Sequence, residues 1–169
     1  MGSNNSSRFN QETFMFFKIL DKLIYHITAF CFLSASSIAF IQVISRYVFN
    51  SSLSWAEEAL RYLFIWMFFL ASAAAFKEKL HVGLDIIVDS FNQKLQTVIH
   101  TVIDILLIIF LSYLVFYGYL FAYENMAQLS TALEIPIGLV NSAIPTGSAL
   151  MILYLVRNIY LRFKDGENQ

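Results

Sequence analysis

Residues 23–45 read LIYHITAFCFLSASSIAFIQVIS, and these 23 residues between Lys22 and Arg46 contain no formally charged side chain. A bilayer core of about 30 Å is crossed by roughly 20 apolar residues in an α-helix. The stretch is therefore long enough to span a membrane, and it is too long for the apolar core of a cleavable signal peptide. It predicts a membrane-spanning helix over residues 22–46.

Three further runs without formal charge follow, of 15, 19 and 22 residues, at 62–76, 105–123 and 135–156. The shortest run can be extended backwards, because Ser54 and Glu57 have the spacing of a capping box and predict a helix that starts at Trp55. The sequence thus predicts an all-α integral membrane protein. Its four transmembrane helices are expected at about 22–46, 55–76, 95–123 and 136–160.

The composition supports this fold class. Hydrophobic residues make up 58% of the 169-residue chain and charged residues only 14%, and the mean hydropathy is +0.62. A soluble domain is typically about a quarter charged. A net charge of −1 gives no general attraction to nucleic acid, and the single cysteine, Cys31, excludes an internal disulfide. We expect one membrane domain over residues 1–169, with a polar N-terminal segment at 1–18 and a polar tail at 161–169.

The basic residues are distributed unequally among the loops. With both termini in the cytoplasm, nine lie inside and two, Arg46 and Arg61, lie outside. Basic residues in short loops favour the cytoplasmic side, so the count predicts that both termini are cytoplasmic. The nine inner residues are Arg8, Lys18, Lys22, Lys77, Lys79, Lys94, Arg157, Arg162 and Lys164.

The second loop has a helical pattern of its own. Apolar residues recur there at helical spacing, while Asp85, Asp89 and Asn92 take another face. This pattern predicts a short amphipathic helix on the inner membrane surface. Its apolar residues are Leu80, Leu84, Ile87, Val88 and Phe91.

Pairs of small residues are expected to shape the contacts between helices. Three pairs of small residues four positions apart, Ala35 with Ala39, Ala71 with Ala75 and Ala143 with Gly147, allow helix backbones to approach closely. These pairs face either other helices of this chain or another membrane protein.

Each proline of the fourth helix has its own expected effect. Pro136 suits the first turn, where a missing N–H costs nothing. Pro145 is interior, so it should kink the helix and free the carbonyl of Asn141.

Ionisable residues are scarce inside the predicted helices. Transport of ions needs polar or ionisable groups within the membrane. The first, second and fourth helices have no Asp, Glu, Lys or Arg in their middles, and Asp104 lies towards the inner part of the third. The chain is poorly equipped to transport alone, which favours a supporting subunit.

The outer end of the second helix holds a charge cluster. Arg61 is spaced for ion pairs with Glu57 and Glu58. The cluster is either a capped helix start with a solvated ion pair, or a network with Arg46 that joins two helices and presents a docking surface. The candidate interface or docking residues are Arg46, Asn50, Ser52, Trp55, Glu57, Glu58 and Arg61.

The three histidines leave a second function open. The pairs His81–Asp85 and His100–Asp104 have i,i+4 spacing, and His26 and His100 lie near the inner ends of their helices. A metal site or two-histidine haem ligation is conceivable from this pattern. The alternative function is a haem-binding membrane anchor of a redox complex. Surface His–Asp pairs are the simpler explanation, and we expect no catalytic residue, no cofactor and no metal.

A series of short motifs carries a resemblance to a known family. The motifs are Arg46–Asn50 (RYVFN), Trp55–Glu58 (WAEE), Arg61–Tyr62, His81–Asp85 (HVGLD), Ser130–Pro136 (STALEIP) and Ile144–Gly147 (IPTG). In this order and spacing, over roughly residues 20–160, the chain resembles the small membrane subunit of tripartite ATP-independent periplasmic (TRAP) transporters, the DctQ-like family. Gly138 departs from the pattern, because many members carry an aromatic residue there.

The resemblance implies a function and partners. It implies a non-catalytic scaffold subunit of a sodium-coupled importer in the bacterial inner membrane. The implied partners are a large transmembrane subunit, which holds the substrate and sodium sites, and a periplasmic substrate-binding protein. Organic acids such as C4-dicarboxylates or sialic acids are the implied substrates. It also implies four helices with both ends cytoplasmic, which agrees with the separate count of basic residues.

Overall fold

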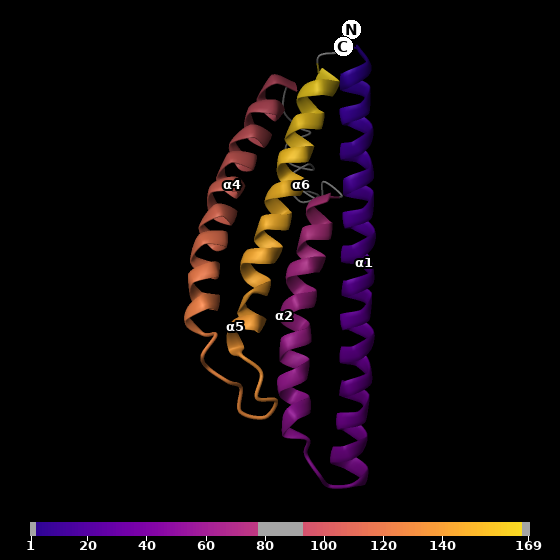
Figure 1. The fold of residues 1–169 in the computed structure, drawn as a ribbon, viewed down its shortest axis with the longest axis vertical. Coiled ribbons are helices and arrows are strands. Elements are labelled where there is room, and N and C mark those ends of the chain that lie inside the picture. Colours follow the sequence, from indigo (N-terminus) through magenta and orange to yellow (C-terminus); the bar gives the residue numbers. More distant parts are fainter. Residues whose placement is uncertain (1–2, 78–92, 167–169) are drawn as a thin grey trace.

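The fold consists of long antiparallel helices. A computed structural model of the chain describes residues 3–77 and 93–166 (Figure 1). Four of its helical segments are long and apolar enough to cross a membrane, which confirms the predicted all-α class with four spans. The predicted amphipathic helix at 80–91 lies outside the described residues. The helices are α1 (Ser3–Val48), α2 (Ser54–Lys77), α4 (Gln93–Glu124), α5 (Ile137–Asn141) and α6 (Ala143–Gly166).

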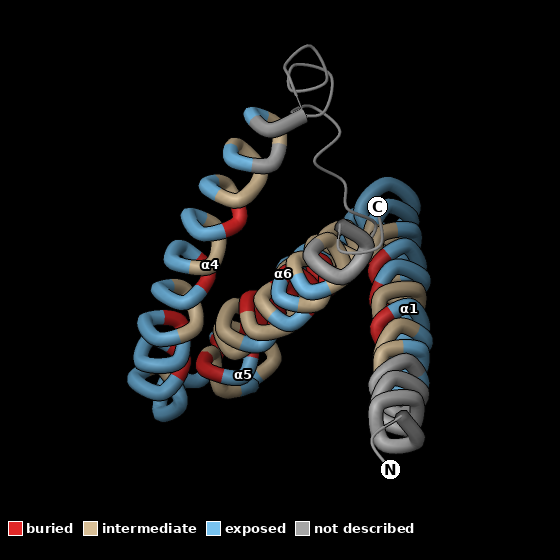
Figure 2. The backbone as a smooth tube through the Cα atoms, turned by 90° about the horizontal axis from the view of Figure 1, so that it is seen from above, coloured by how far each residue is buried: buried red, intermediate tan, exposed pale blue. Residues whose placement is uncertain are grey.

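The helices contact one another in the order α1, α2, α6 and α4. Seen along the helices, α1 and α4 lie on opposite sides of α6 (Figure 2). In this arrangement, few residues of three of the four spans are buried. In the most apolar window of α1, α2 and α4, 11% of the residues are buried, against 39% in the window that includes α6.

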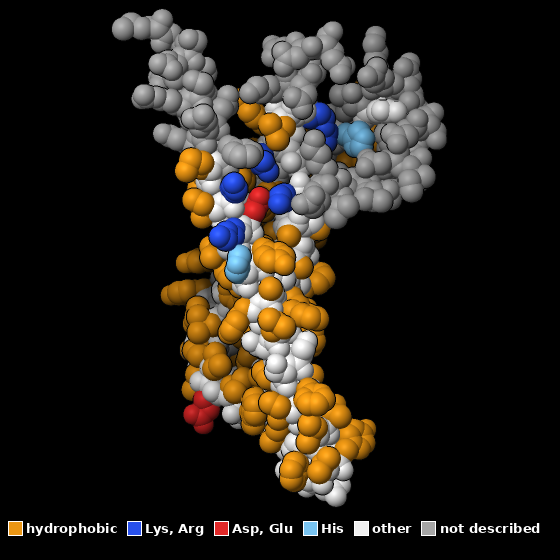
Figure 3. Space-filling model, turned by 90° about the vertical axis from the view of Figure 1, so that its right-hand side faces the viewer, with side chains coloured by type: hydrophobic (Ala, Val, Ile, Leu, Met, Phe, Trp, Pro, Cys, Tyr) orange, Lys and Arg blue, Asp and Glu red, His pale blue; other side chains and the backbone are white. Residues whose placement is uncertain are grey.

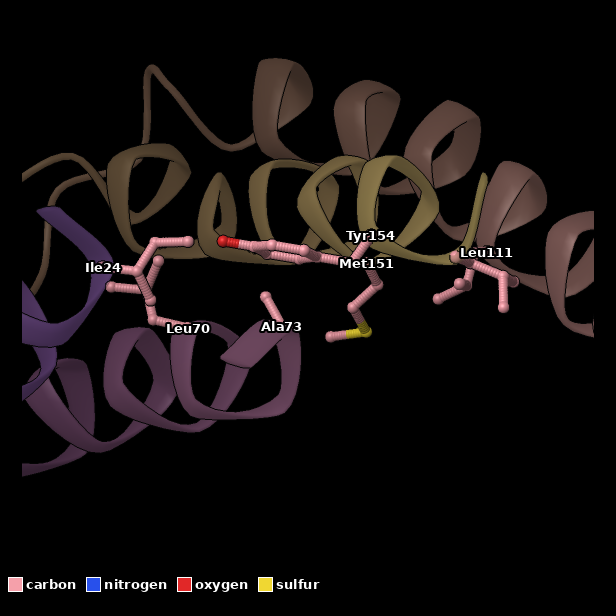
Figure 4. Packing of buried hydrophobic residues seen from close by; sticks show 7 residues of the cluster. Ile24, Leu70, Ala73, Leu111, Met151 and Tyr154 are labelled. Carbon is pink, nitrogen blue, oxygen red and sulfur yellow. The ribbon is translucent and has the colours of Figure 1, made fainter. Parts of the chain in front are cut away.

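The core lies where α6 meets its neighbours. Tyr154 and Leu155 of α6 are each 1% exposed, and Ile24 of α1, Leu70 of α2 and Leu111 of α4 pack in the same cluster (Figure 4). The cluster thus draws on all four long helices. Because α6 supplies its most deeply buried side chains, α6 is the central helix of the fold.

Small residues explain the close approach of α6 to α2. A Cβ atom at Gly147 would lie 2.6 Å from the Cβ of Phe69, so nothing larger than glycine fits without a shift. Ala143, one turn earlier, is 1% exposed. The prediction of close packing is therefore confirmed for this pair, and it is satisfied within the chain.

The pair on α2 behaves differently. Ala71 is exposed and Ala75 is only partly buried, whereas Ala35 on α1 is buried. The alternative that Ala71 and Ala75 pack closely against another helix of this chain is therefore wrong. Their small side chains instead leave a hollow on the surface between α1 and α2.

The fourth span, predicted at 136–160, covers Ile137–Arg162, and an interruption at Ser142 divides it into α5 and α6. Pro145 has no N–H to donate to the carbonyl of Asn141. The chain turns three residues before this proline, and Pro145 then occupies the first turn of α6, where no N–H is needed. The N–H groups of Ser142 and Thr146 still donate to Gly138 O (2.9 Å) and Ser142 O (3.2 Å).

The first helix begins well before the expected residue 22. α1 starts at Ser3 and has 46 residues. At 1.5 Å per residue it is about 69 Å long. A bilayer with its headgroup regions is only about 40–45 Å thick. One end of α1 therefore extends beyond a membrane that the rest of the helix crosses.

Candidate functional site

The uncharged runs of the four spans separate the charged side chains of the described residues into two groups. We call the end with residues 3 and 166 the terminal end. The opposite end carries residues 49–53 and 125–136, and we call it the loop end (Figure 1). All seven candidate residues from the sequence lie at the loop end.

Glu58 is the most connected of these candidates. One of its carboxylate oxygens accepts hydrogen bonds from the backbone N–H groups of Ala132 (3.0 Å) and Leu133 (2.9 Å). The other accepts one from the hydroxyl of Tyr62 at 3.0 Å. Glu58 thus joins the start of α2 to the loop between α4 and α5. The sequence singled out Glu58 but missed these backbone partners.

The loop held by Glu58 is itself compact. Ser130 donates its N–H to Ile135 O at 2.9 Å, and its hydroxyl oxygen accepts the N–H of Ile135 at 3.2 Å. Leu129 forms an isolated antiparallel bridge with Pro136. Between them, Glu134 is exposed and has a left-handed φ of 54°. The loop therefore presents an acidic side chain on a fixed turn.

The loop between α1 and α2 is a second fixed turn. Asn50 has a left-handed φ of 49°, a conformation that asparagine tolerates better than most residues. Ser45 accepts the N–H of Ser51 on its carbonyl at 3.1 Å and donates its hydroxyl to Ser51 O at 2.8 Å. Asn50 and Ser52 are exposed, and Trp55 is 40% exposed.

The predicted ion pairs of the cluster are not formed among the described side chains. Glu57 accepts a hydrogen bond from the amide of Gln42 on α1 at 3.4 Å, while Arg46 and Arg61 are exposed. The capping box also differs from its prediction, because α2 already begins at Ser54 and Glu57 faces α1. The two helices are joined here by Gln42 and Glu57 rather than by Arg46.

At the terminal end, polar contacts tie α6 to α1 and α2. Asp21 of α1 lies 3.3 Å from the Nζ of Lys77 and accepts the hydroxyl of Tyr154 at 2.6 Å. Asn158 donates to the carbonyl of Phe76 at 2.8 Å. Partners from three helices meet here, so no single helix pattern could have predicted them.

An ion pair between a buried carboxylate and a partly exposed arginine ties α4 to α6 at the same end. Asp104 is 3% exposed and lies 2.8 Å from the guanidinium of Arg162. A buried carboxylate needs such a partner, because desolvation of a lone charge is costly. The predicted pair of His81 with Asp85 lies outside the described residues.

The histidines do not converge. His26 is on α1 and His100 is on α4, on opposite sides of α6 (Figure 2). The ring Nδ1 of His26 lies 2.6 Å from the carbonyl oxygen of Lys22 on its own helix. Two-histidine haem ligation therefore has no geometric support among the residues that the structure describes.

Comparisons with known proteins agree with one family. The family description "Tripartite ATP-independent periplasmic transporters, DctQ component" matches residues 35–165. A TRAP transporter small permease protein of Haemophilus influenzae is 32% identical over 134 residues, covering 76% of this chain and 83% of that protein. The sialic acid TRAP transporter small permease protein SiaQ of Vibrio cholerae is 24% identical, covering 70% of this chain and 69% of that protein.

A longer relative is also informative. The sialic acid TRAP transporter permease protein SiaT of Haemophilus influenzae is 22% identical over 89% of this chain, which corresponds to 24% of its own length. A segment similar to nearly the whole chain is thus one part of a much larger permease. Together with the four apolar helices and the loop-end motifs, these matches show that the chain belongs to the DctQ family of small TRAP transporter subunits.

Proposed function

We propose that the chain is the non-catalytic scaffold subunit of a sodium-coupled, binding-protein-dependent transporter in the bacterial inner membrane. It braces a large transmembrane subunit, and its loop end helps to dock a periplasmic substrate-binding protein. The imported substrate is an organic acid of the C4-dicarboxylate or sialic acid type. The names of the relatives SiaQ and DctQ of Vibrio cholerae support these two substrate classes.

The observation that carries the proposal is the open arrangement of an apolar chain. Three of the four spans have 11% of their most apolar window buried, so broad apolar faces are free to contact another membrane protein. In the described residues, no Asp, Glu, Lys or Arg occurs between Lys22 and Arg46 of α1, between Arg61 and Lys77 of α2, between Asp104 and Glu124 of α4, or between Glu134 and Arg157. Such a chain can brace a transporter but lacks the groups that move an ion.

The longer relative supports the same partner. In SiaT, the segment similar to this chain belongs to one polypeptide with a larger permease. Two proteins that are joined in one organism and separate in another commonly act together. We therefore take the large transmembrane subunit as the partner of the apolar faces.

The loop end supports docking. Glu58 accepts two backbone hydrogen bonds from the 130–135 loop, and Arg46, Glu57 and Arg61 are exposed charges at the same end of the molecule. A surface of fixed loops and mixed charge suits transient recognition of a soluble partner. The bracing contacts would then lie along the helices and the docking contacts at the loop end.

Reconstitution tests the proposal. Liposomes with this chain alone should take up no carboxylate, whereas liposomes with this chain, the large subunit, the binding protein and a sodium gradient should take it up. Sodium-driven uptake by the chain alone would refute the scaffold role. Full uptake by liposomes that contain the large subunit, the binding protein and a sodium gradient but not this chain would also refute the scaffold role.

A charge reversal tests docking within the same system. Arg61→Glu should leave co-purification with the large subunit unchanged and should lower uptake at limiting binding protein. Arg8→Glu, the same charge reversal on α1 at the terminal end, is the matched control and should leave both co-purification and uptake unchanged. Loss of co-purification in Arg61→Glu would assign the residue to bracing rather than docking.

A further inference from the structure

A groove follows the surface between α1 and α2 from the Lys77 end of α2 to the middle of that helix. It consists of two adjoining hollows of about 370 Å³ and 570 Å³, which share Tyr25, Thr28 and Ala71. The hollow nearer the terminal end also includes Asp21 and Lys77. The other hollow is lined in addition by Ala29, Phe32, Phe64, Met67 and Phe68.

The groove exists because the two helices do not fill their contact evenly. Ala71 and Ala75 leave a shallow wall on α2, while Tyr25 of α1 is 72% exposed and Phe68 of α2 is 65% exposed beside it. Further along α1, Ala35 is 2% exposed, so the helices close together there. The opening is therefore confined to one half of the α1–α2 contact.

The length of the groove matches one leaflet of a bilayer. On α1 it extends from Asp21 to Phe32, a separation of eleven residues or about 16 Å at 1.5 Å per residue. On α2 it extends from Lys77 back to Phe64, a separation of thirteen residues or about 20 Å. Half of a hydrocarbon core of about 30 Å is about 15 Å. The groove therefore covers about the depth of one leaflet rather than the whole hydrocarbon core.

The mouth of the groove carries a surplus of positive charge. Asp21 is held by Lys77 at 3.3 Å and by the hydroxyl of Tyr154 at 2.6 Å. Lys18 and Lys22 are exposed, and they continue the α1 face of Tyr25 at helical spacing. Lys77 lines the hollow beside Asp21, and Lys18 and Lys22 lie three residues before and one residue after Asp21 on α1, so basic side chains outnumber the single carboxylate here. Figure 3 shows basic side chains gathered at this end, beside a hydrophobic surface that continues along the helices.

We propose that this groove binds an anionic phospholipid from the leaflet at the terminal end. Lys18, Lys22 and Lys77 hold the phosphate, and one acyl chain lies along Tyr25 and Ala71. The second, wholly apolar hollow takes the end of that acyl chain. A charged mouth, an apolar body and the length of one leaflet together fit a lipid molecule.

Native mass spectrometry of the full chain in detergent tests the site, with phosphatidylglycerol and phosphatidylcholine of identical acyl chains as probes. One phosphatidylglycerol should be retained in preference to phosphatidylcholine. Lys22→Gln should weaken that preference by about fivefold, the typical effect of one lysine near an anionic lipid surface. Arg46→Gln, which removes a basic residue at the other end of α1, should not.

Filling the groove separates this site from general lipid coating. Ala71→Leu should abolish retention of the lipid, whereas Ser36→Leu, at an exposed position of α1 outside both hollows, should not. Equal retention of the two lipids, or retention that survives Ala71→Leu, would overturn the proposal. Because these measurements use the chain alone, their outcome is independent of its assembly with a large subunit.

Photo-crosslinking in intact membranes identifies the occupant. With p-benzoylphenylalanine in place of Phe68, illumination of the assembled complex should give an adduct with the mass of a phospholipid. An adduct to the large subunit or to a second copy of this chain would show that the groove is a protein contact. That result, or the absence of a lipid adduct, would overturn the proposal.

Discussion

At the scale of single residues, Glu58 shows what a local pattern can and cannot predict. The sequence places it in a charge cluster at the start of the second helix, and the structure keeps it at the loop end. Its assigned partner was Arg61, because i,i+3 spacing is visible in one helix. Its actual partners are the N–H groups of Ala132 and Leu133, 74 and 75 residues away. Backbone donors have no residue type, so no sequence pattern identifies them.

This contact gives a prediction for the 130–135 loop. Glu58→Ala removes the acceptor of both N–H groups, so amide hydrogen exchange in that loop should become several-fold faster. Glu57→Ala is the matched control and should leave the exchange unchanged, because Glu57 contacts Gln42 of α1. Hydrogen-exchange mass spectrometry of the purified chain measures both.

The same contact predicts the outcome of a charge swap. Glu58→Arg should also release the loop, and adding Arg61→Glu should not restore it, since the lost partners are backbone groups. Restoration of slow exchange in the double variant would show that Glu58 and Arg61 pair after all.

At the scale of helices, the uncharged runs predicted the four spans, because bilayer thickness sets a length that sequence reveals directly. The break before α6 was not predictable in the same way. Pro145 requires that the helix bend or stop. The hydroxyl groups of neighbouring residues influence whether it bends or stops. Ser142 donates to Leu139 O and Thr146 donates to Ser142 O, each at 2.7 Å. These bonds depend on side-chain rotamers that spacing does not specify.

Gly147 gives a prediction about the contact between α2 and α6. Gly147→Val places new carbon atoms against Phe69, where even a Cβ would lie 2.6 Å away. Overpacking of this kind typically costs about 1–3 kcal/mol. Leu153→Phe adds the same number of carbons to α6 at a side chain that is 46% exposed, and it should have little effect. Unfolding of the purified variants in mixed micelles compares them, and equal stability would contradict the packing described here.

At the scale of the whole molecule, the structure places the loops at 49–53 and 125–136 at one end and residues 3 and 166 at the other (Figure 1). The sequence predicted this alternation from four spans, and it assigned the sides from the basic residues. What it could not predict is the open order α1, α2, α6, α4. The central helix is the one whose small residues pack against large side chains of its neighbours. Gly147 of α6 packs in this way against Phe69 of α2, which is distant in the sequence.

Cysteine labelling tests the predicted sides of the membrane. A reagent that cannot cross the membrane should label Ser52→Cys and Ala132→Cys from the periplasm, because both positions are exposed at the loop end. It should not label Asn168→Cys until the membrane is opened. Labelling of Asn168→Cys alone would invert the orientation and remove the loop end from the binding protein.

The four antiparallel crossings have a consequence for how such proteins change during evolution. Because the chain returns to the side on which it begins, a polypeptide joined to either end starts on that same side. A gene fusion can then append a second membrane protein without inverting it, provided that protein also has a terminus there. The long relative SiaT, in which a similar segment makes up 24% of the protein, is consistent with this rule. An odd number of crossings would instead have placed a protein fused to the C-terminus on the opposite side of the membrane.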